Sequence, residues 1–180
     1  MSNQPGAMAA GAPIEQQLRI LGDRAIATFG SADQQISLSV VVTGGSFASL
    51  RDVILPIAQE MLRHAVEHGM AMLRQGRIDV SLIEQDGSTV LSVHDNGWAL
   101  LEDSRAADTM ASIAGLAAPC HGVALLRRNQ DVTEAVVVFP ATPAGTGMKS
   151  RIDRLLLALL EPFRNAGNLL GRSQAGLSSR

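Results

Sequence analysis

The sequence predicts an α/β (α+β) two-layer sandwich, with helices on one face of a mixed, mostly antiparallel sheet. Two observations predict it. The patterns run helix, strand, helix, two strands, helix, two strands, and strands that follow one another as hairpins are antiparallel. Hydrophobic residues make up 46% of the 180 residues, which is enough for a substantial core. A doubly wound parallel sheet does not fit this order.

Patterns of apolar residues in the N-terminal part of the chain predict two helices and a strand. From Pro13 to Gly30, apolar residues recur at helical spacing. Residues 35–43 (QISLSVVVT) alternate and are rich in β-branched residues, which is typical of a strand. The longest helical pattern covers 47–73, and Pro56 is expected to kink or divide that helix.

The remaining patterns predict two strand pairs with a helix between them. In order they are strands over 77–84 and 89–94, a helix over about 109–119, and strands over 122–127 and 133–139. Asp86-Gly87 lies between the first two strands, and Asp-Gly is a strong signal for a tight hairpin.

Composition and charge divide the chain into a body and a basic appendage. The expected organisation is a disordered N-terminus over 1–12, a domain over 13–141, a linker over 142–148, an amphipathic helix over 149–172 and a disordered tail over 173–180. Residues 1–148 carry 9 basic and 15 acidic residues, whereas 149–180 carry 6 basic and 2 acidic residues.

Bulk properties point to a cytoplasmic protein. The formal net charge of −2 gives no bias toward nucleic acid. The single cysteine excludes an internal disulfide, which fits a reducing compartment. The first residues lack the basic and apolar regions of a signal peptide, and no apolar run reaches the roughly 18 residues that span a bilayer.

Two motifs carry a resemblance to a known family. Residues 60–69 (EMLRHAVEHG) and 93–99 (VHDNGWA) resemble the N-box and the following Asp-x-Gly-x-Gly motif of the GHKL, or histidine-kinase-like, ATPases. The first motif matches at Glu60, Ala65, His68 and Gly69, and the second at Asp95 and Gly97. The chain departs at His64, where the family has asparagine, and at Ala99, where it has glycine. The resemblance covers about 14–141 and implies a Bergerat-type fold.

The resemblance also implies a nucleotide site made of Glu60, His64, Ala65, His68, Asp95, Gly97 and Ala99. The family's N-box asparagine helps to hold Mg²⁺, which prefers hard oxygen ligands, so the imidazole of His64 is a poor substitute. The family's aspartate accepts a hydrogen bond from adenine, and Asp95 with Gly97 retains that chemistry. The family's glycine-rich lid is replaced here by an acidic stretch that contains Glu102, Asp103 and Asp108.

These departures predict a degenerate ATPase-fold regulator, a pseudokinase rather than an enzyme. It would hold no cofactor, or ATP and Mg²⁺ only weakly, and we assign no catalytic residue. The first 63 residues contain no histidine, so the phosphoacceptor helix of a histidine kinase is missing. The resemblance to bacterial histidine kinases and anti-sigma kinases implies that the partner is a signalling protein: a kinase, a response regulator or a sigma-factor system.

Two other functions remain open. The chain is an active ATP-dependent protein kinase if His64 takes over the role of the asparagine. Alternatively, Glu60, His64 and His68, at i, i+4 and i+8, form a metal-binding stripe with Cys120 or His121, which would make this a small metal-binding domain.

Several residues carry a structural alternative beside the functional one. Asp95-Asn96-Gly97 is also a good turn sequence. His94-Asp95 resembles the pair found at phosphorylated histidines, although a strand end is an unusual place for it. Cys120 beside His121 is either a nucleophile or a small packed residue. Trp98 either covers the adenine pocket or packs in the core.

The C-terminal helix has one broad apolar face, formed by Ile152, Leu155, Leu156, Leu159, Leu160 and Phe163. It packs against its own domain or a second copy in a homodimer, lies on an anionic membrane surface, or binds a partner protein. The sequence leaves these readings open.

Overall fold

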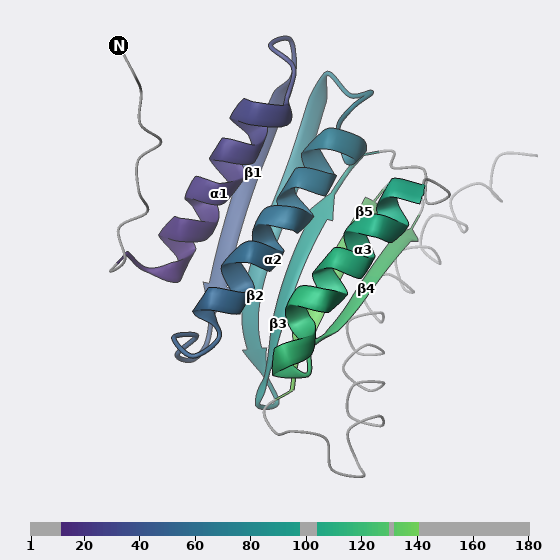
Figure 1. Cartoon of the computed structure of the whole chain (residues 1–180). Helices are drawn as coiled ribbons and strands as arrows, with labels where there is room; N and C mark the ends of the chain where they lie inside the picture. Colours follow the sequence, from purple (N-terminus) through teal and green to yellow (C-terminus); the bar gives the residue numbers. More distant parts are fainter. Residues whose placement is uncertain (1–11, 98–103, 130–131, 141–180) are drawn as a thin grey trace, which may run out of the picture. The chain divides into compact units, whose positions relative to one another are not determined.

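The computed structural model describes residues 12–97, 104–129 and 132–140, which form three α-helices, two short helical turns and five strands (Figure 1). In chain order these are α1 (Ile14–Phe29), β1 (Gln35–Thr43), α2 (Arg51–His64), the π-helical turn η1 (Ala65–Gly69), β2 (Gln75–Gln85), β3 (Ser88–Asp95), α3 (Ser104–Ala117), the 3-10 turn η2 (Ala118–Cys120), β4 (Val123–Asn129) and β5 (Val132–Phe139).

The five strands form one open sheet in the order β1-β2-β3-β5-β4. The pair β1 and β2 is parallel, because α2 crosses over between them, and the other three pairs are antiparallel. The predicted mixed, mostly antiparallel sheet is therefore confirmed.

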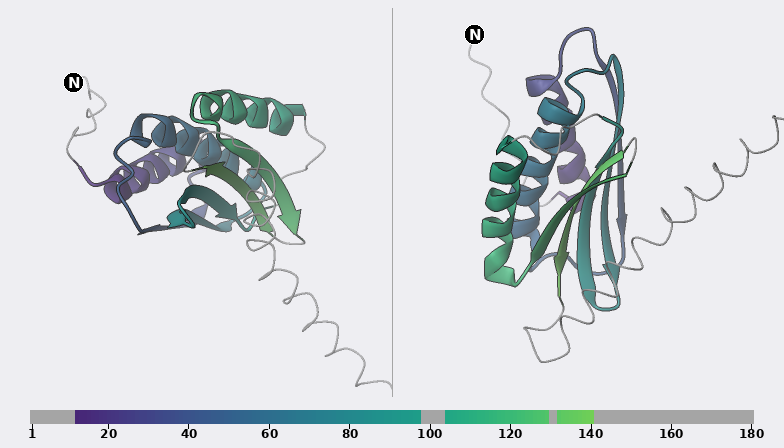
Figure 2. Two further views of the ribbon diagram at one scale, coloured as in Figure 1. Left: turned by 90° about the horizontal axis from the view of Figure 1, so that it is seen from below. Right: turned by 90° about the vertical axis from the view of Figure 1, so that its right-hand side faces the viewer.

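All three α-helices lie side by side on one face of the sheet, as the two turned views show (Figure 2). The core lies between these two layers. Its fully buried side chains include Leu18, Ile54, Ile57, Met61, Leu62, Ile78, Leu82, Leu91, Ile113 and Phe139. Burial of this apolar surface is the main driving force for packing the helices onto the sheet. The two-layer sandwich is as the sequence predicts.

A close helix-to-strand contact fixes α1 on the sheet. Leu18, Leu21 and Ala25 form the buried face of α1. Gly22 lies on the same face, and a Cβ placed there would overlap the side chain of Leu38 on β1. Glycine at this position therefore lets helix and strand approach closely.

The β2–β3 hairpin has the two-residue turn that the sequence predicts. Gln85 pairs with Ser88, so only Asp86 and Gly87 connect the strands. Both have positive φ, 51° and 71°, as a type I′ turn requires. The register then places Ile78, Val80 and Leu82 on the helix-covered face.

The long helical pattern over 47–73 is realised as a shorter helix with a different interruption. The helix begins at Arg51, and Pro56 lies inside it without dividing it. Proline removes one hydrogen bond, to the carbonyl of Asp52, and Asp52 is exposed at the helix surface. The α-helix ends at His64 and continues as the π-turn η1, in which Met70 N–H donates to the Ala65 carbonyl at 2.9 Å.

The third helix begins five residues earlier than the apolar spacing indicates, at Ser104 rather than near residue 109. Its first turns contain the alanines Ala106 and Ala107, which favour helix strongly but leave little trace in a hydrophobic pattern. The strand pair that follows is confirmed. β4 begins one residue later and ends two residues later than predicted, and β5 begins one residue earlier.

Residues 1–11, the linker 142–148, the helix 149–172 and the tail 173–180 lie outside the described residues, so these parts of the predicted organisation stay predictions. Within the described ranges, no helix has the length and apolar character needed to cross a membrane.

Candidate functional site

A polar cleft of about 350 Å³ lies between the C-terminal half of α2, its π-turn and the middle of α3. Its lining consists of Glu60, Arg63, Glu67, His68, Asp108, Thr109 and Ser112. Two of the residues that the N-box resemblance assigns, Glu60 and His68, are among them. The acidic Asp108, assigned to the lid stretch, faces them from α3.

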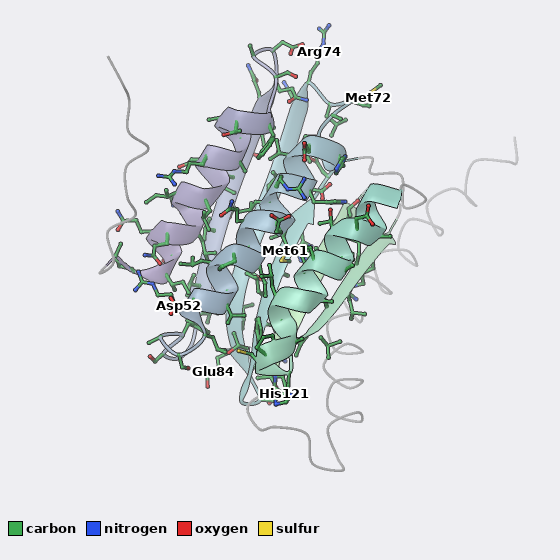
Figure 3. The ribbon with its side chains drawn as sticks, in the orientation of Figure 1. Asp52, Met61, Met72, Arg74, Glu84 and His121 are labelled. Carbon is green, nitrogen blue, oxygen red and sulfur yellow. The ribbon has the colours of Figure 1, made fainter. Side chains whose placement is uncertain are left out.

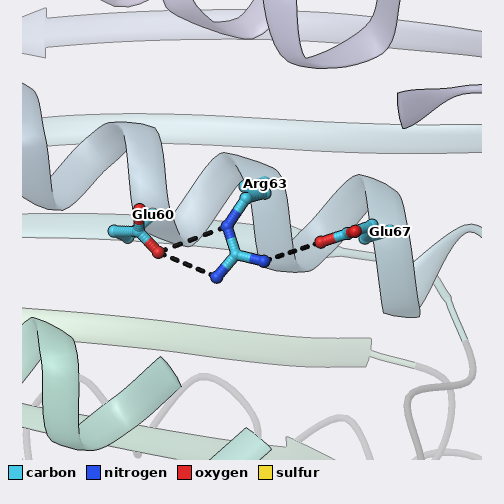
Figure 4. Close-up of polar contacts among 3 residues, drawn as sticks. All are labelled: Glu60, Arg63 and Glu67. Carbon is cyan, nitrogen blue, oxygen red and sulfur yellow. Dashed lines mark hydrogen bonds and ion pairs between the residues drawn. The ribbon is translucent and has the colours of Figure 1, made fainter. Parts of the chain in front are cut away.

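An ion-pair network occupies the α2 side of this cleft (Figure 4). The guanidinium of Arg63 donates through Nη2 and Nε to Glu60 Oε2, at 2.8 and 3.3 Å, and through Nη1 to Glu67 Oε2 at 2.7 Å. The hydrogen bond that Arg63 donates to Glu60, joined by the one to Glu67, raises the pKa of Arg63 above its usual value. The cation is thus committed to two carboxylates of its own helix.

The charges of the lining residues determine which ligands the cleft favours. Among the lining residues whose side chains the structure describes, Glu60, Glu67 and Asp108 contribute three negative charges and Arg63 one positive charge, which gives a formal sum of −2. Like charges repel strongly at short range, so a triphosphate in this cleft would face net repulsion. Arg63 and Glu67 were not predicted as site residues, although the spacing Glu-x-x-Arg-x-x-x-Glu is a recognisable i, i+3 and i+4 pattern.

His64 and His68 lie next to each other at the end of α2 and differ in exposure. His64 is 5% exposed and belongs to the buried side of α2, outside the cleft lining, whereas His68 faces the cleft. Their rings are 5.0 Å apart and tilted by 60°. Of the predicted stripe, Glu60 and His68 line the cleft, whereas His64 lies beside His68 and is buried outside the lining.

The structure brings the two sequence motifs into direct contact. The N-box ends at Gly69, and a Cβ placed there would lie 2.6 Å from Asp95 Oδ1. A Cβ on Gly97 would overlap the carbonyl oxygen of Gly69. A side chain at either position would clash, so both residues have to be glycine. The end of the π-turn packs against the end of β3. Ala65 is buried beside them at 2% exposure.

Asp95 and its neighbours form an ordered turn after β3. Asp95 Oδ1 accepts from Gly97 N–H at 2.9 Å. Asn96 Oδ1 accepts from Arg77 N–H at 2.7 Å, which ties the turn to the start of β2. These two bonds order the segment, and Asp95 is 4% exposed on the helix-covered face.

Thr133 is a residue of this corner that sequence reasoning missed. It is the cross-strand partner of Asp95, directly opposite on β5, and therefore lies on the same inner face. Its hydroxyl is buried and has no hydrogen-bond partner among the described residues. Only the strand register reveals this pairing, because 38 positions separate the two residues in sequence.

His94 lies on the opposite face of the sheet from Asp95, because successive strand residues alternate. There its Nε2 pairs with Glu134 Oε1 at 2.9 Å, and Arg127 pairs with the other oxygen of Glu134. The three residues stand opposite one another on β3, β5 and β4. His94 is therefore part of a row of polar side chains on the outer face, away from the cleft.

The metal-binding alternative finds no support in the described residues, which bring no three His, Cys, Asp or Glu side chains into a metal-holding arrangement. Cys120 and His121 follow the C-terminal end of α3. Figure 3 shows His121 at the opposite end of the domain from Met72, which follows the π-turn. Ala99, Trp98, Glu102 and Asp103 lie outside the described residues.

Comparison with solved structures identifies the architecture. The histidine kinase domain of the blue-light activated kinase EL346 from Erythrobacter litoralis aligns with a TM-score of 0.59 at 16% identity, over 76% of this chain and 66% of that one. The chain has the fold of a GHKL-type histidine kinase catalytic domain. At this identity the likeness establishes the fold alone.

Two further catalytic domains show the same GHKL-like fold. The catalytic domain of histidine kinase ThkA aligns with a TM-score of 0.55 at 14% identity, over 72% of this chain and 91% of that one. The mycobacterial sensor histidine kinase MprB aligns with a TM-score of 0.51 at 15% identity, over 72% of this chain and 96% of that one. This chain spans 42% of a longer EL346 kinase chain. No sequence profile of a protein family and no curated protein sequence matches the chain.

Proposed function

We propose that this GHKL-fold protein is a regulatory pseudokinase of bacterial signal transduction, which acts by binding a signalling protein and binds ATP weakly or not at all. The observation that carries the proposal is the cleft beside the N-box helix. Its one described cation, Arg63, is held by Glu60 and Glu67, and Asp108 adds a third carboxylate. Phosphoryl transfer needs Mg²⁺ and donors aimed at the phosphates, and this lining offers mainly acceptors.

The base-binding corner supports the ancestry of the site rather than its activity. Asp95 and Thr133 lie opposite each other on the inner face, and Gly69 and Gly97 hold the two motifs in contact. His64 stands at the position of the Mg²⁺-binding asparagine and is buried. The corner that meets adenine in the family is thus retained, whereas the corner that meets metal and phosphate is altered.

Titration calorimetry with Mg-ATP is the direct test. We expect no binding tighter than about 1 mM, the weak end of specific recognition. Micromolar binding together with phosphorylation of a partner would overturn the proposal and establish the alternative, an active ATP-dependent protein kinase.

Two sets of variants locate the defect. Replacing Glu67 by Gln and Asp108 by Asn removes two negative charges from the cleft, so we expect ATP affinity to rise more than adenosine affinity. Glu84→Gln, an exposed charge on β2, is the matched control and should change neither. His64→Asn restores the family residue. Binding that appears only in this variant indicates a relic site. Measurable ATP binding by the wild-type chain that this variant leaves unchanged or weakens favours an unusual active site.

The partner is tested without nucleotide. Purified response regulators, kinases and sigma-factor components from the source organism are presented to the full chain, and affinity is measured with and without Mg-ATP. The proposal requires at least one partner to bind equally well in both conditions. A partner that binds only with Mg-ATP contradicts it.

A further inference from the structure

The two edges of the sheet differ in how well they are protected against pairing with another strand. The edge strand β4 contains Arg127 and Arg128, and charged residues on an edge oppose intermolecular pairing. The other edge strand, β1, has nine residues (QISLSVVVT) with no charge and no proline. Its register with β2 runs from Gln35 to Thr43 without a bulge. This edge therefore lacks the usual protections.

The backbone groups on the free side of β1 belong to the even-numbered residues. Gln35 N–H donates to the Arg74 carbonyl on the β2 side at 2.8 Å. Since N–H and C=O groups alternate in direction along a strand, the groups of Ile36, Leu38, Val40 and Val42 point away from β2. Among the described residues, β1 pairs with β2 alone.

The side chains of β1 are arranged so that the strand complements itself. The apolar residues Ile36, Leu38, Val40 and Val42 share the helix-covered face, and Ser37, Ser39 and Val41 share the exposed face. If a second copy of β1 runs antiparallel to the first and is centred on Ser39, residues of the same face lie opposite each other. Ile36 is then opposite Val42, and Leu38 is opposite Val40. Val41 is 51% exposed although it is a large apolar residue.

We propose that β1 is a homodimer interface, in which the β1 strands of two copies pair antiparallel about a two-fold axis at Ser39. This arrangement hydrogen-bonds the free groups of the even-numbered residues, overlaps all nine residues and brings no charged residue opposite its copy. The half-buried side chains of Ile36, Leu38 and Val42 then form one apolar row that extends across both copies. Such an isologous contact closes, so it yields a dimer rather than a fibre. The inference is independent of whether the cleft binds nucleotide.

The first test is the mass of the full chain in solution. Light scattering after size exclusion should give twice the chain mass of 18.9 kDa. Ser39→Lys places two like charges opposite each other at the axis and should give the monomer mass. Gln85→Lys adds the same charge to an exposed position of β2 and should leave the dimer intact.

A charge-swap experiment separates loss of pairing from loss of folding. Ser39→Lys and Ser39→Asp are each expected to be monomeric, and an equimolar mixture of the two should recover the dimer mass. A monomeric mixture, a dimeric Ser39→Lys variant or a monomeric wild-type chain at tens of micromolar would each overturn the proposal.

The register is tested by disulfide formation in a Cys120→Ser background. Opposed residues at a non-hydrogen-bonded antiparallel pair have Cα atoms about 4.5 Å apart, within disulfide range. Ser39→Cys should therefore oxidise to a covalent dimer. Ser37→Cys is the control, because its copy lies four residues away along the strand, roughly 13 Å, and should not cross-link. Equal cross-linking of both variants, or none of Ser39→Cys, contradicts the register.

Discussion

At the residue scale, Arg63 is the group on which the character of the cleft depends. It bridges two carboxylates at i−3 and i+4 that would otherwise repel each other on the same helix face. The bridge explains how three acidic residues coexist in a small cleft, and why Arg63, the one cation among the described lining residues, is a weak anchor for phosphate.

Arg63→Met should lower the free energy of unfolding by about 0.5–1 kcal/mol, because it removes two helical ion pairs and leaves Glu60 facing Glu67. Urea denaturation measures this, and the effect should shrink at high salt. Arg19→Met is the control: Arg19 and Glu15 are 3.8 Å apart and about half exposed, so we expect a change close to zero. A larger loss at Arg19 would contradict this account.

For Thr133 we expect the opposite effect on the free energy of unfolding. A buried hydroxyl without a partner loses its hydration on folding and gains nothing in return. Thr133→Val keeps the shape and should raise the free energy of unfolding by about 1 kcal/mol in thermal or urea melts. Ser92→Ala, which removes the 2.7 Å bond to Ser81, should lower it. A destabilised Thr133→Val protein would mean that the hydroxyl has a partner in solution.

At the element scale, the π-turn after α2 carries the last residues of the N-box. The turn contains His68, which lines the cleft, and it ends at Gly69, which lies against Asp95. π-turns often occur at functional sites, in keeping with the family position of this motif. The close approach of the two glycines then fixes the end of the helix against β3.

This contact predicts contrasting effects for two glycines. Gly97→Ala should destabilise the domain by roughly 1–3 kcal/mol, because its Cβ would overlap the Gly69 carbonyl. Gly115→Ala, in α3 with no atom near the added Cβ, should stabilise it by about 0.5–1 kcal/mol. Paired urea melts measure both. Equal effects of the same sign would show that the close approach is absent in solution.

At the scale of the whole molecule, the question is which segment makes a dimer. The proposed interface lies in β1, whereas the amphipathic helix over 149–172 remains the sequence-based candidate. A chain that ends at Gly147 should therefore keep the oligomeric state of the full chain, as measured by light scattering. Loss of the dimer on truncation would identify the C-terminal helix as the interface and refute the β1 assignment.

The sequence by itself determined the layers, the strands and the position of both motifs. Alternation in β1, the Asp86-Gly87 turn and the apolar spacing of α1 are local signals, because each arises from neighbours in the chain. The start of α3 was harder to predict from apolar periodicity, because alanine favours a helix but does not show which face of the helix is buried.

Only the tertiary structure decided which of the motif residues meet. Sequence spacing placed Glu60, His64 and His68 on one stripe, and the packing of the domain decided that His64 is buried while Glu60 and His68 line the cleft. Thr133 stands opposite Asp95 only because β5 pairs with β3, and Gly69 touches Gly97 only because α2 lies on that strand. These are contacts between segments distant in the chain, and long-range pairing depends on the packing of the whole core rather than on any local pattern.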